Sequence, residues 1–560
     1  MPFAAQLGTT TVMNSLLRLL APGFDDRTAL RAVYFVALYW SVLFLVVFYF
    51  PPADYDVNSS YLYRIKADEL GSMRANSTLD LQYLFPTFFD FLHAPFLKLG
   101  YFIGAPSFIL ATAFLVLVLR ESKNAAEFNL TVLIVFATQP FLVLATAAKN
   151  DLALGVFAFL AWYAIFRVKK DAKYFPLALI PIFCLVGTKW LGIPLAVLFF
   201  FVLLFESVKE KTWSRFTPLY LALLLPLYWW TGSLTSYLDN YLEFGTPTPV
   251  PDFLKGAANV AFLPNLVRFI CFSLLDSFDL FTWLLEFVVG HPLLPYLNDI
   301  TLGAKSHRLT VLPSAELCSF GIILPLLLSF ALLRLARAGR SYPYLVAAAA
   351  AVLHLAVILY QIRLDTGDSR YLFPVFTLLV LPAVSQLAGM ARARQLLIPP
   401  LIGLLIIQVF IGTFWHHDRR LLEINFKIAP DKVHNIDSVW SKALDRDHLW
   451  FAVWGGEFPV FEYMRKNVTK ADSLLVLTYH GAESTFLYPF VKDRHGSNTR
   501  VWWNQKLGPP PEPYLRKFDF VLLCKIELES GEPAMLLEKA GFRLVNKSFQ
   551  KALYQRVARS

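Results

Sequence analysis

The sequence contains few charged residues: Asp, Glu, Lys and Arg together make up 16% of its 560 positions. Soluble globular domains have a charged fraction of about 25%, so this composition excludes an ordinary soluble enzyme. Apolar residues account for 56% instead, and the mean hydropathy is +0.51. These values predict a membrane protein, because a bilayer-spanning helix needs a run of about 20 apolar residues.

The sequence is also poor in cysteine, and it lacks glycine-rich loops. The four cysteines are widely separated and form no CxxC pair, and three of them lie in or beside apolar segments, which favours packing as small hydrophobic residues. No GxGxxG or similar phosphate loop is present, which disfavours nucleotide binding. An internal repeat of the transporter type is also lacking.

Long apolar runs recur from residue 32 to residue 415. They predict a polytopic α-helical membrane protein with about eleven transmembrane helices. The expected spans are 31–51, 99–119, 127–147, 151–167, 174–187, 190–205, 216–232, 317–333, 343–360, 371–390 and 395–415. The stretch 174–205 is interpreted as two spans broken at Gly187-Thr188-Lys189, although one long kinked helix also fits its composition.

The distribution of Lys and Arg predicts the orientation, because short cytoplasmic loops are rich in these residues. With a cytoplasmic N-terminus, fourteen of them fall in cytoplasmic loops and four in the short outer loops, provided that 174–205 forms two spans. The net charge of +10 then reflects a basic belt beside anionic membrane lipids, and nucleic acid is not an expected partner. The first helix has no signal-peptide layout and is expected to remain as an anchor in the cell (inner or plasma) membrane.

Two outer regions and a C-terminal domain interrupt the helical pattern. Residues 1–415 form the predicted membrane domain, with outer loops at 52–98, which has amphipathic segments typical of the membrane interface, and at 233–316. From about residue 456, short β-rich runs alternate with amphipathic helices. Residues 416–560 are therefore predicted to form a small extracytoplasmic α/β domain with a mostly parallel sheet and a terminal hairpin.

Ionisable residues gather at one predicted membrane face. Each costs about 2.5 to 3.5 kcal/mol in a membrane span, so each requires an explanation. On the outer side lie Asp56 and Arg64; Lys149, Asn150 and Asp151; Thr188 and Lys189; and Asp365, Asp368 and Arg370. Singly, they have ordinary interpretations, such as helix capping for Asp151 or snorkelling for Lys189. Together, they favour a site for chemistry on a phosphate-bearing lipid.

Five motifs, in order between residues 50 and 380, are similar to those of polytopic glycosyltransferases with the GT-C fold. They are YDVNSSYLYRI, LATAAKNDLALGVF, LVGTKWLGI, NYLEFGTPTPVP and GDSRYLFPVF. The relatives that the chain resembles use lipid-carrier donors and include aminoarabinose transferases of lipid A, galacturonosyltransferases of lipopolysaccharide and protein O-mannosyltransferases. The chain departs from the family pattern at Ser60 and Tyr61, where relatives often have Tyr-His, and at Tyr63, where they have Pro.

The resemblance implies transfer of a hexosyl or pentosyl group from a polyprenyl-phosphate donor to an acceptor hydroxyl of an envelope glycan, lipid or protein, on the outer face and with inversion. Asp56 is the expected general base, since a carboxylate at the membrane surface is partly desolvated and more basic. Asp151 would orient the acceptor or hold Asp56 and Arg64. The donor phosphate would be bound by Arg64, Lys189 and Arg370. Further candidates for acceptor or sugar contacts are Tyr61, Asp90, His93, Asn150 and Asp368.

No metal or other cofactor is required by these motifs. Asp365 and Asp368 could bind Mg²⁺ or Mn²⁺ through oxygen atoms, but their spacing is weak support. Two other functions remain open at this stage. A lipid-linked oligosaccharide ligase or polymerase would have a large outer loop late in the chain and no need for Asp56. A transporter or flippase would have charges at mid-membrane depth and paired broken helices.

Overall fold

The computed structural model divides into two compact units. It describes residues 27–49, 88–98, 104–147, 149–167, 175–210, 222, 224–226, 233–247, 262–273, 318–337, 341–362, 368–414, 424–429, 432–436, 458–469, 471–478, 499–503, 509–524, 531–548 and 551–557. The described residues of the first unit end with a helix at residue 414, and those of the second begin with a strand at residue 424.

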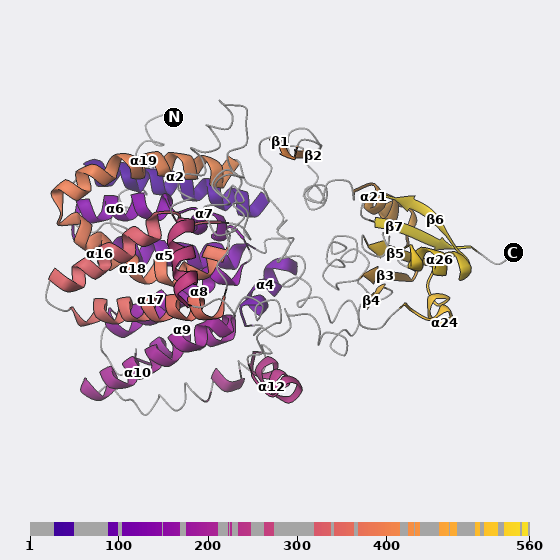
Figure 1. Ribbon diagram of the computed structural model, residues 1–560, viewed down its shortest axis with the longest axis horizontal. Coiled ribbons are helices and arrows are strands. Elements are labelled where there is room, and N and C mark those ends of the chain that lie inside the picture. Colours follow the sequence, from indigo (N-terminus) through magenta and orange to yellow (C-terminus); the bar gives the residue numbers. More distant parts are fainter. Residues whose placement is uncertain are drawn as a thin grey trace, which may run out of the picture. The chain divides into compact units, whose positions relative to one another are not determined.

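The first unit is helical (Figure 1). Its labelled helices are α2 (Arg27–Tyr49), α4 (Phe88–Lys98), α5 (Ala105–Arg120), α6 (Ala125–Phe136), α7 (Gln139–Leu144), α8 (Asn150–Phe166), α9 (Leu179–Thr188), α10 (Ile193–Lys209), α12 (Ser233–Phe244), α16 (Ile323–Arg337), α17 (Tyr342–Gln361), α18 (Phe373–Ala388) and α19 (Ala391–Phe414). Within the described ranges, five helical stretches are long and apolar enough to cross a membrane, and five shorter apolar helices accompany them. The chain is therefore a polytopic integral membrane protein.

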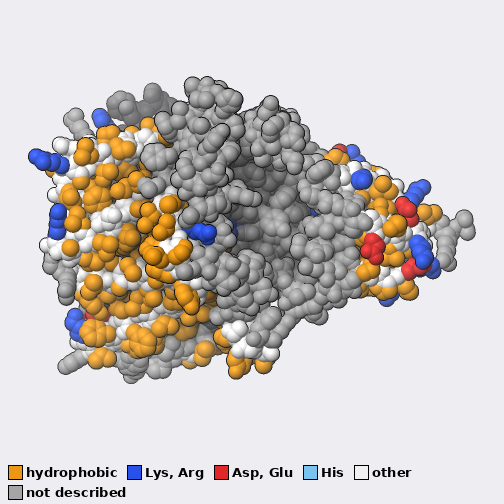
Figure 2. Space-filling model, in the orientation of Figure 1, with side chains coloured by type: hydrophobic (Ala, Val, Ile, Leu, Met, Phe, Trp, Pro, Cys, Tyr) orange, Lys and Arg blue, Asp and Glu red, His pale blue; other side chains and the backbone are white. Residues whose placement is uncertain are grey.

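Helix α8 packs against α5, α9, α10, α17 and α18. Its sequence is apolar on all sides, and most of its residues are buried, as expected for a helix with no polar face. Helix α10, in contrast, has an outward row of apolar side chains, namely Val197, Phe201, Phe205 and Val208. Figure 2 shows hydrophobic side chains over most of the described surface of this unit, with Lys and Arg along its left edge. Such a surface suits contact with lipid tails.

One predicted span is divided in the structure, and one predicted break is confirmed. The predicted span 127–147 is broken into α6 and α7 near Thr138, and Pro140 stands in the first turn of α7, where its missing N–H costs no hydrogen bond. The stretch 174–205 forms two helices, as expected: α9 ends at Thr188, and a 3₁₀ turn η5 (Trp190–Gly192) leads into α10. The predicted span 216–232 lies largely outside the described residues, so the number of eleven helices stays a prediction.

The second unit contains a five-stranded sheet in the order β4-β3-β5-β7-β6. Strand β3 (Leu474–Thr478) runs parallel to β4 (Thr499–Trp503) and β5 (Phe520–Cys524), and β7 (Lys551–Arg556) pairs antiparallel with β5 and with β6 (Phe542–Lys547). The sheet thus combines a parallel part, β4-β3-β5, with the terminal hairpin β6–β7 that the sequence predicts. The hairpin joins the sheet through β7. A separate hairpin pairs β1 (Ile424–Ala429) with β2 (Lys432–Ile436).

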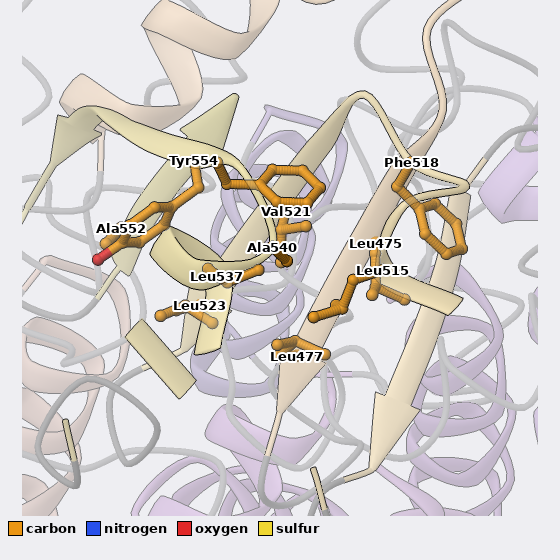
Figure 3. Packing of buried hydrophobic residues seen from close by; sticks show 11 residues of the cluster. Leu475, Leu477, Leu515, Phe518, Val521, Leu523, Leu537, Ala540, Ala552 and Tyr554 are labelled. Carbon is orange, nitrogen blue, oxygen red and sulfur yellow. The ribbon is translucent and has the colours of Figure 1, made fainter. Parts of the chain in front are cut away.

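A hydrophobic core lies against this five-stranded sheet (Figure 3). Leu475 and Leu477 of β3 and Val521 and Leu523 of β5 are fully buried, and they alternate along their strands as side chains on one face must. Leu537 of α26 (Glu532–Lys539) belongs to the same core. Two further helices among the described residues of the unit are α21 (Phe458–Asn467) and α24 (Glu512–Leu515).

Candidate functional site

Only part of the predicted site falls on described residues. Asp56, Tyr61 and Arg64 lie outside them, as does Asp365. The backbones of Asp90 and Asp368 are described, in α4 and in the 3₁₀ turn η6 (Asp368–Leu372), but their side chains are not. The predicted residues whose side chains can be placed are His93, Asn150, Asp151, Lys189 and Arg370.

Asp151 lies in the first turn of α8 and is almost fully buried. The position is favourable for a carboxylate, because the free N–H groups at a helix N-terminus carry partial positive charge. The N-cap residue is Lys149, which has an extended backbone and makes no side-chain capping hydrogen bond. The segment does begin a helix, but the expectation that Asp151 caps it is wrong, and burial of the carboxylate needs a further explanation.

That explanation is a pair of cations from two other segments. The Nζ of Lys189 lies 2.7 Å from one oxygen of Asp151, and the Nε of Arg370 lies 3.8 Å from the other oxygen. Both cations also lie over the ring of Tyr371, at 4.2 Å for Lys189 Nζ and 5.1 Å for Arg370 Cζ. Arg370 Nη2 donates a hydrogen bond of 3.2 Å to the Tyr371 hydroxyl. The sequence predicts that these charges converge, but not that Asp151 pairs with Lys189.

Lys189 is positioned by the break between α9 and α10. Its backbone is extended, while its N–H still bonds the carbonyl of Leu185 and its own carbonyl accepts from Gly192. A side chain at Gly192 would collide with the carbonyl group of Leu185, so the turn needs glycine for close approach. The broken helix thus turns the Lys189 side chain toward the start of α8.

Arg370 is positioned by close packing between α8 and α18. Gly155, one turn after Asp151, lies so near Phe373 that an added Cβ would collide with the Phe373 ring and come within 3.0 Å of its backbone carbonyl. In the next turn of α18, the Thr377 hydroxyl donates to the Gly155 carbonyl at 2.7 Å. Since Phe373 follows Arg370 by three residues, this contact sets the separation between Arg370 and Asp151.

Asn150 adds a buried acceptor beside the cluster. Its Nδ2 donates to the Thr188 carbonyl at 3.4 Å, and its Oδ1 has no hydrogen-bond partner within the described part of the chain. A buried, unsatisfied oxygen costs about 1 to 3 kcal/mol. An arriving hydroxyl or amide donor would satisfy it.

His93 is buried in α4, a helix that packs against α5, α8 and α9. Its Nδ1 lies 2.8 Å from the Phe89 carbonyl, so Nδ1 donates and Nε2 is the acceptor nitrogen. Burial lowers the pKa of His93 to about 4, although the hydrogen bond to Phe89 opposes this shift, so the ring is neutral near pH 7. Within the described ranges, no hydrogen bond joins His93 to the Asp151 cluster.

Among the described residues, the cations of the cluster outnumber its carboxylate. Lys149 is fully buried and acts electrostatically on Asp151, so three cationic side chains surround one carboxylate among the described residues. The sequence reasoning missed two of its neighbours, Tyr371 and the buried His354 of α17, which lies 2.9 Å from the Tyr371 carbonyl. Tyr371 directly follows Arg370 in the motif GDSRYLFPVF, so its place beside the cluster could be inferred from the sequence. Nothing comparable singles out His354.

The described part of the cluster suits an anion more than a metal ion, because its side chains are mostly cationic. In the described part of the chain, no three His, Cys, Asp or Glu side chains gather as metal ligands would. The four cysteines are free thiols, three of them buried.

Comparisons with known proteins give weak similarity. No protein-family model matches the chain, and no curated protein matches it. Among solved structures, ArnT from Cupriavidus metallidurans bound to undecaprenyl phosphate is 13% identical with a TM-score of 0.45. The apo structure of the same protein is 14% identical with a TM-score of 0.47. Each match covers 94% of this chain and 98% of the other. Both TM-scores lie below 0.5, so this similarity does not establish a common fold.

Proposed function

We propose that this protein is a GT-C glycosyltransferase that transfers a sugar from a polyprenyl-phosphate donor to an acceptor hydroxyl at the outer face of the membrane. The observation that carries the proposal is the buried cluster of Lys149, Lys189 and Arg370 around Asp151. A phosphate on a lipid carrier supplies the negative charge that such a cluster favours. The five family-like motifs support the same function, because Lys149 and Asp151 come from the KND motif, Lys189 from the GTK motif and Arg370 from the DSR motif.

The reaction forms a bond between the acceptor oxygen and the anomeric carbon of the sugar, and breaks the bond from that carbon to the phosphate oxygen. Asp56 takes the proton of the acceptor hydroxyl. The polyprenyl phosphate leaves with the electron pair and gains negative charge, which Arg64, Lys189 and Arg370 stabilise. Attack opposite to the leaving phosphate inverts the anomeric configuration.

Asp151 acts in this scheme as the residue that orients the two cations. A carboxylate between Lys189 and Arg370 holds both side chains in place and offsets part of their mutual repulsion. The unsatisfied Oδ1 of Asn150 accepts a hydroxyl of the sugar or of the acceptor. Tyr61, Asp90, His93 and Asp368 complete the set of proposed contacts around the two substrates.

The position of the cluster along α8 supports a site at one membrane face. Asp151 and Arg167 stand at opposite ends of the helix, separated by about 24 Å along its axis. Arg167 belongs to the basic belt that the positive-inside rule assigns to the cytoplasm. The Asp151 end then faces outward. A transporter would instead favour charges at mid-membrane depth, so this arrangement speaks against transport.

The proposal is tested with the purified full chain in detergent, using undecaprenyl phosphate binding and sugar transfer as separate measurements. We expect Lys189→Met and Arg370→Met to weaken undecaprenyl phosphate binding about 10-fold or more, since each removes a charge-assisted contact. Asp56→Asn should abolish transfer and leave binding intact. Arg167→Gln, at the other end of α8, is the matched control and should bind as the unchanged protein does.

Candidate donors and acceptors come from a deletion strain, by mass spectrometry of its lipid-linked sugars and envelope glycans. Loss of one sugar residue from a glycan, with accumulation of its polyprenyl-phosphate form, identifies the pair to use in the transfer assay. Full turnover by Asp56→Asn would remove Asp56 as the base. Equal binding by Lys189→Met and the unchanged protein would contradict the phosphate site.

A further inference from the structure

His354 is a fully buried histidine in the middle of the apolar helix α17. Its Nε2 lies 2.9 Å from the backbone carbonyl oxygen of Tyr371. A carbonyl only accepts hydrogen bonds, so Nε2 carries the proton, and Nδ1 is the nitrogen with the free electron pair. Nδ1 has no hydrogen-bond partner among the described residues. The hydrogen bond to Tyr371 is therefore the one polar contact of this ring in the described ranges.

The Tyr371 carbonyl needs a partner from another helix. It belongs to the 3₁₀ turn η6, in which a carbonyl bonds the N–H three residues ahead. Three residues after Tyr371 stands Pro374, which has no N–H to donate. His354 supplies a donor to this part-buried carbonyl, for which Pro374 offers none.

Two of the three cations of the cluster lie over the ring of Tyr371. Lys189 lies 4.2 Å from the ring centroid and Arg370 lies 5.1 Å from it. Lys189 is near enough to His354 to act on it electrostatically, so the imidazole lies near the cluster. The backbone of Tyr371 thus contacts α17, while its ring contacts Lys189 and Arg370, the two cations nearest Asp151.

We propose that His354 is a positioning residue: by donating from Nε2 to the Tyr371 carbonyl it holds η6 in place, and so fixes Arg370 and the Tyr371 ring against Lys189 and Asp151. Its part in turnover rests on the proposed function, whereas its contact with Tyr371 does not. His354 touches neither the donor nor the acceptor in this role. It acts only through the geometry of the turn.

The test compares His354→Gln with His354→Asn in the full chain. The Gln side chain reaches about as far as Nε2 and keeps an N–H donor for the carbonyl, whereas Asn has the same amide but is too short to reach. We expect Gln to keep undecaprenyl phosphate binding and transfer within a few-fold of the unchanged protein. Asn should lose about 10- to 100-fold in both, the range seen when a catalytic group is displaced by a small distance.

The pH profile of transfer separates positioning from proton transfer. With Gln in place of His354, the profile should keep its shape, because a positioning residue exchanges no proton with the substrate. Thr413→Val is the control for loss of a buried hydrogen bond elsewhere, since it removes the 2.7 Å contact with Tyr39 that joins α19 to α2. This variant should lose stability without losing transfer per folded molecule.

A second measurement tests the contact between His354 and the Tyr371 carbonyl without any substrate. Nitrogen NMR of the ¹⁵N-histidine-labelled full chain, with the His354 signal assigned by its absence in His354→Gln, should find the proton on Nε2. A proton on Nδ1 would overturn the proposal, as would Asn binding and turnover equal to those of Gln. If the unchanged protein binds no undecaprenyl phosphate, the proposed function fails, and the NMR result still decides the position of His354.

Discussion

The ion pairs at the two ends of helix α8 differ in how far they are buried. At its beginning, the side chains of Asp151, Lys189 and Arg370 are 3%, 8% and 13% exposed. At its end, Arg167 pairs with Glu121 of the α5 terminus at 3.0 Å, with side chains 31% and 19% exposed. Both ends hold opposite charges in contact. Only the first removes them from water almost completely.

This difference bears on what each pair contributes. Removing ions from water costs several kcal/mol per ion, which attraction between them offsets only when the geometry is good. A partly exposed pair pays a smaller desolvation cost and contributes about 0 to 1 kcal/mol. Burial of the ion pairs at the Asp151 end therefore contributes less to stability than their short distances suggest. Their burial fits the proposed role of this end as a binding site.

The largest expected effect comes from Asp151→Ala, which leaves Lys189 and Arg370 buried without their shared carboxylate. Breaking a buried pair in this way costs about 3 to 5 kcal/mol of unfolding free energy. Unfolding of the purified protein, followed in mixed detergent with increasing SDS, measures it. The double variant Asp151→Ala, Lys189→Met should recover part of the loss, because the ammonium group of Lys189 is then removed together with its carboxylate partner. A double variant less stable than Asp151→Ala would contradict this account of the cluster.

The next effect concerns the packing that sets the cluster's dimensions. Gly155→Ala would press a methyl group against Phe373 and separate α8 from α18, at a cost of about 1 to 3 kcal/mol. Because the same contact spaces Asp151 from Arg370, we also expect weaker undecaprenyl phosphate binding. Gly403→Ala in α19 is the matched control, since an added Cβ there meets open space. Equal behaviour of the two variants would show that the close approach at Gly155 is not needed.

Much of this arrangement follows from local sequence, and the rest from packing between distant segments. The break at Lys189 could be predicted because two spans, in place of one kinked helix, keep the loops rich in Lys and Arg on one side of the membrane. The terminal hairpin could be predicted too, but not its position beside β5, because the partner of a hairpin depends on contacts across the whole unit. His354 was missed for a similar reason: its partner is a backbone carbonyl in another element, and a backbone carbonyl has no signature in the sequence.

Asp519 in the C-terminal unit is a third charged group to set beside the two ends of α8. Its carboxylate is partly exposed and accepts several short hydrogen bonds. Ser473 donates to it from both its backbone N–H, at 2.9 Å, and its hydroxyl, at 2.8 Å. Arg556 lies 2.9 Å from its other oxygen. Burial alone would raise the pKa of Asp519, but the Ser473 hydrogen bonds and the Arg556 charge outweigh it and hold the pKa below the usual value.

A carboxyl whose pKa is lowered by folding stabilises the folded state above its unfolded pKa of about 3.9, and the stabilisation is lost as the pH falls through the folded value. We therefore expect Asp519→Asn to lower stability by about 1 kcal/mol at pH 7, after allowance for solvent screening. Near pH 3, the variant and the unchanged protein should differ less. Thermal unfolding of the full chain at the two pH values measures both, and a difference that grows toward low pH would contradict the direction of the shift.

The smallest expected effect is at the far end of α8, where Glu121→Gln neutralises the partner of Arg167. Water reaches both side chains, so the loss of unfolding free energy should stay below about 1 kcal/mol and shrink further at high salt. Undecaprenyl phosphate binding should not change, because about 24 Å of helix separates this pair from Asp151. The same detergent unfolding series used for Asp151→Ala supplies the measurement. A loss as large as that of Asp151→Ala would mean that burial is not what distinguishes the two ends, and that the helix depends equally on both ion pairs.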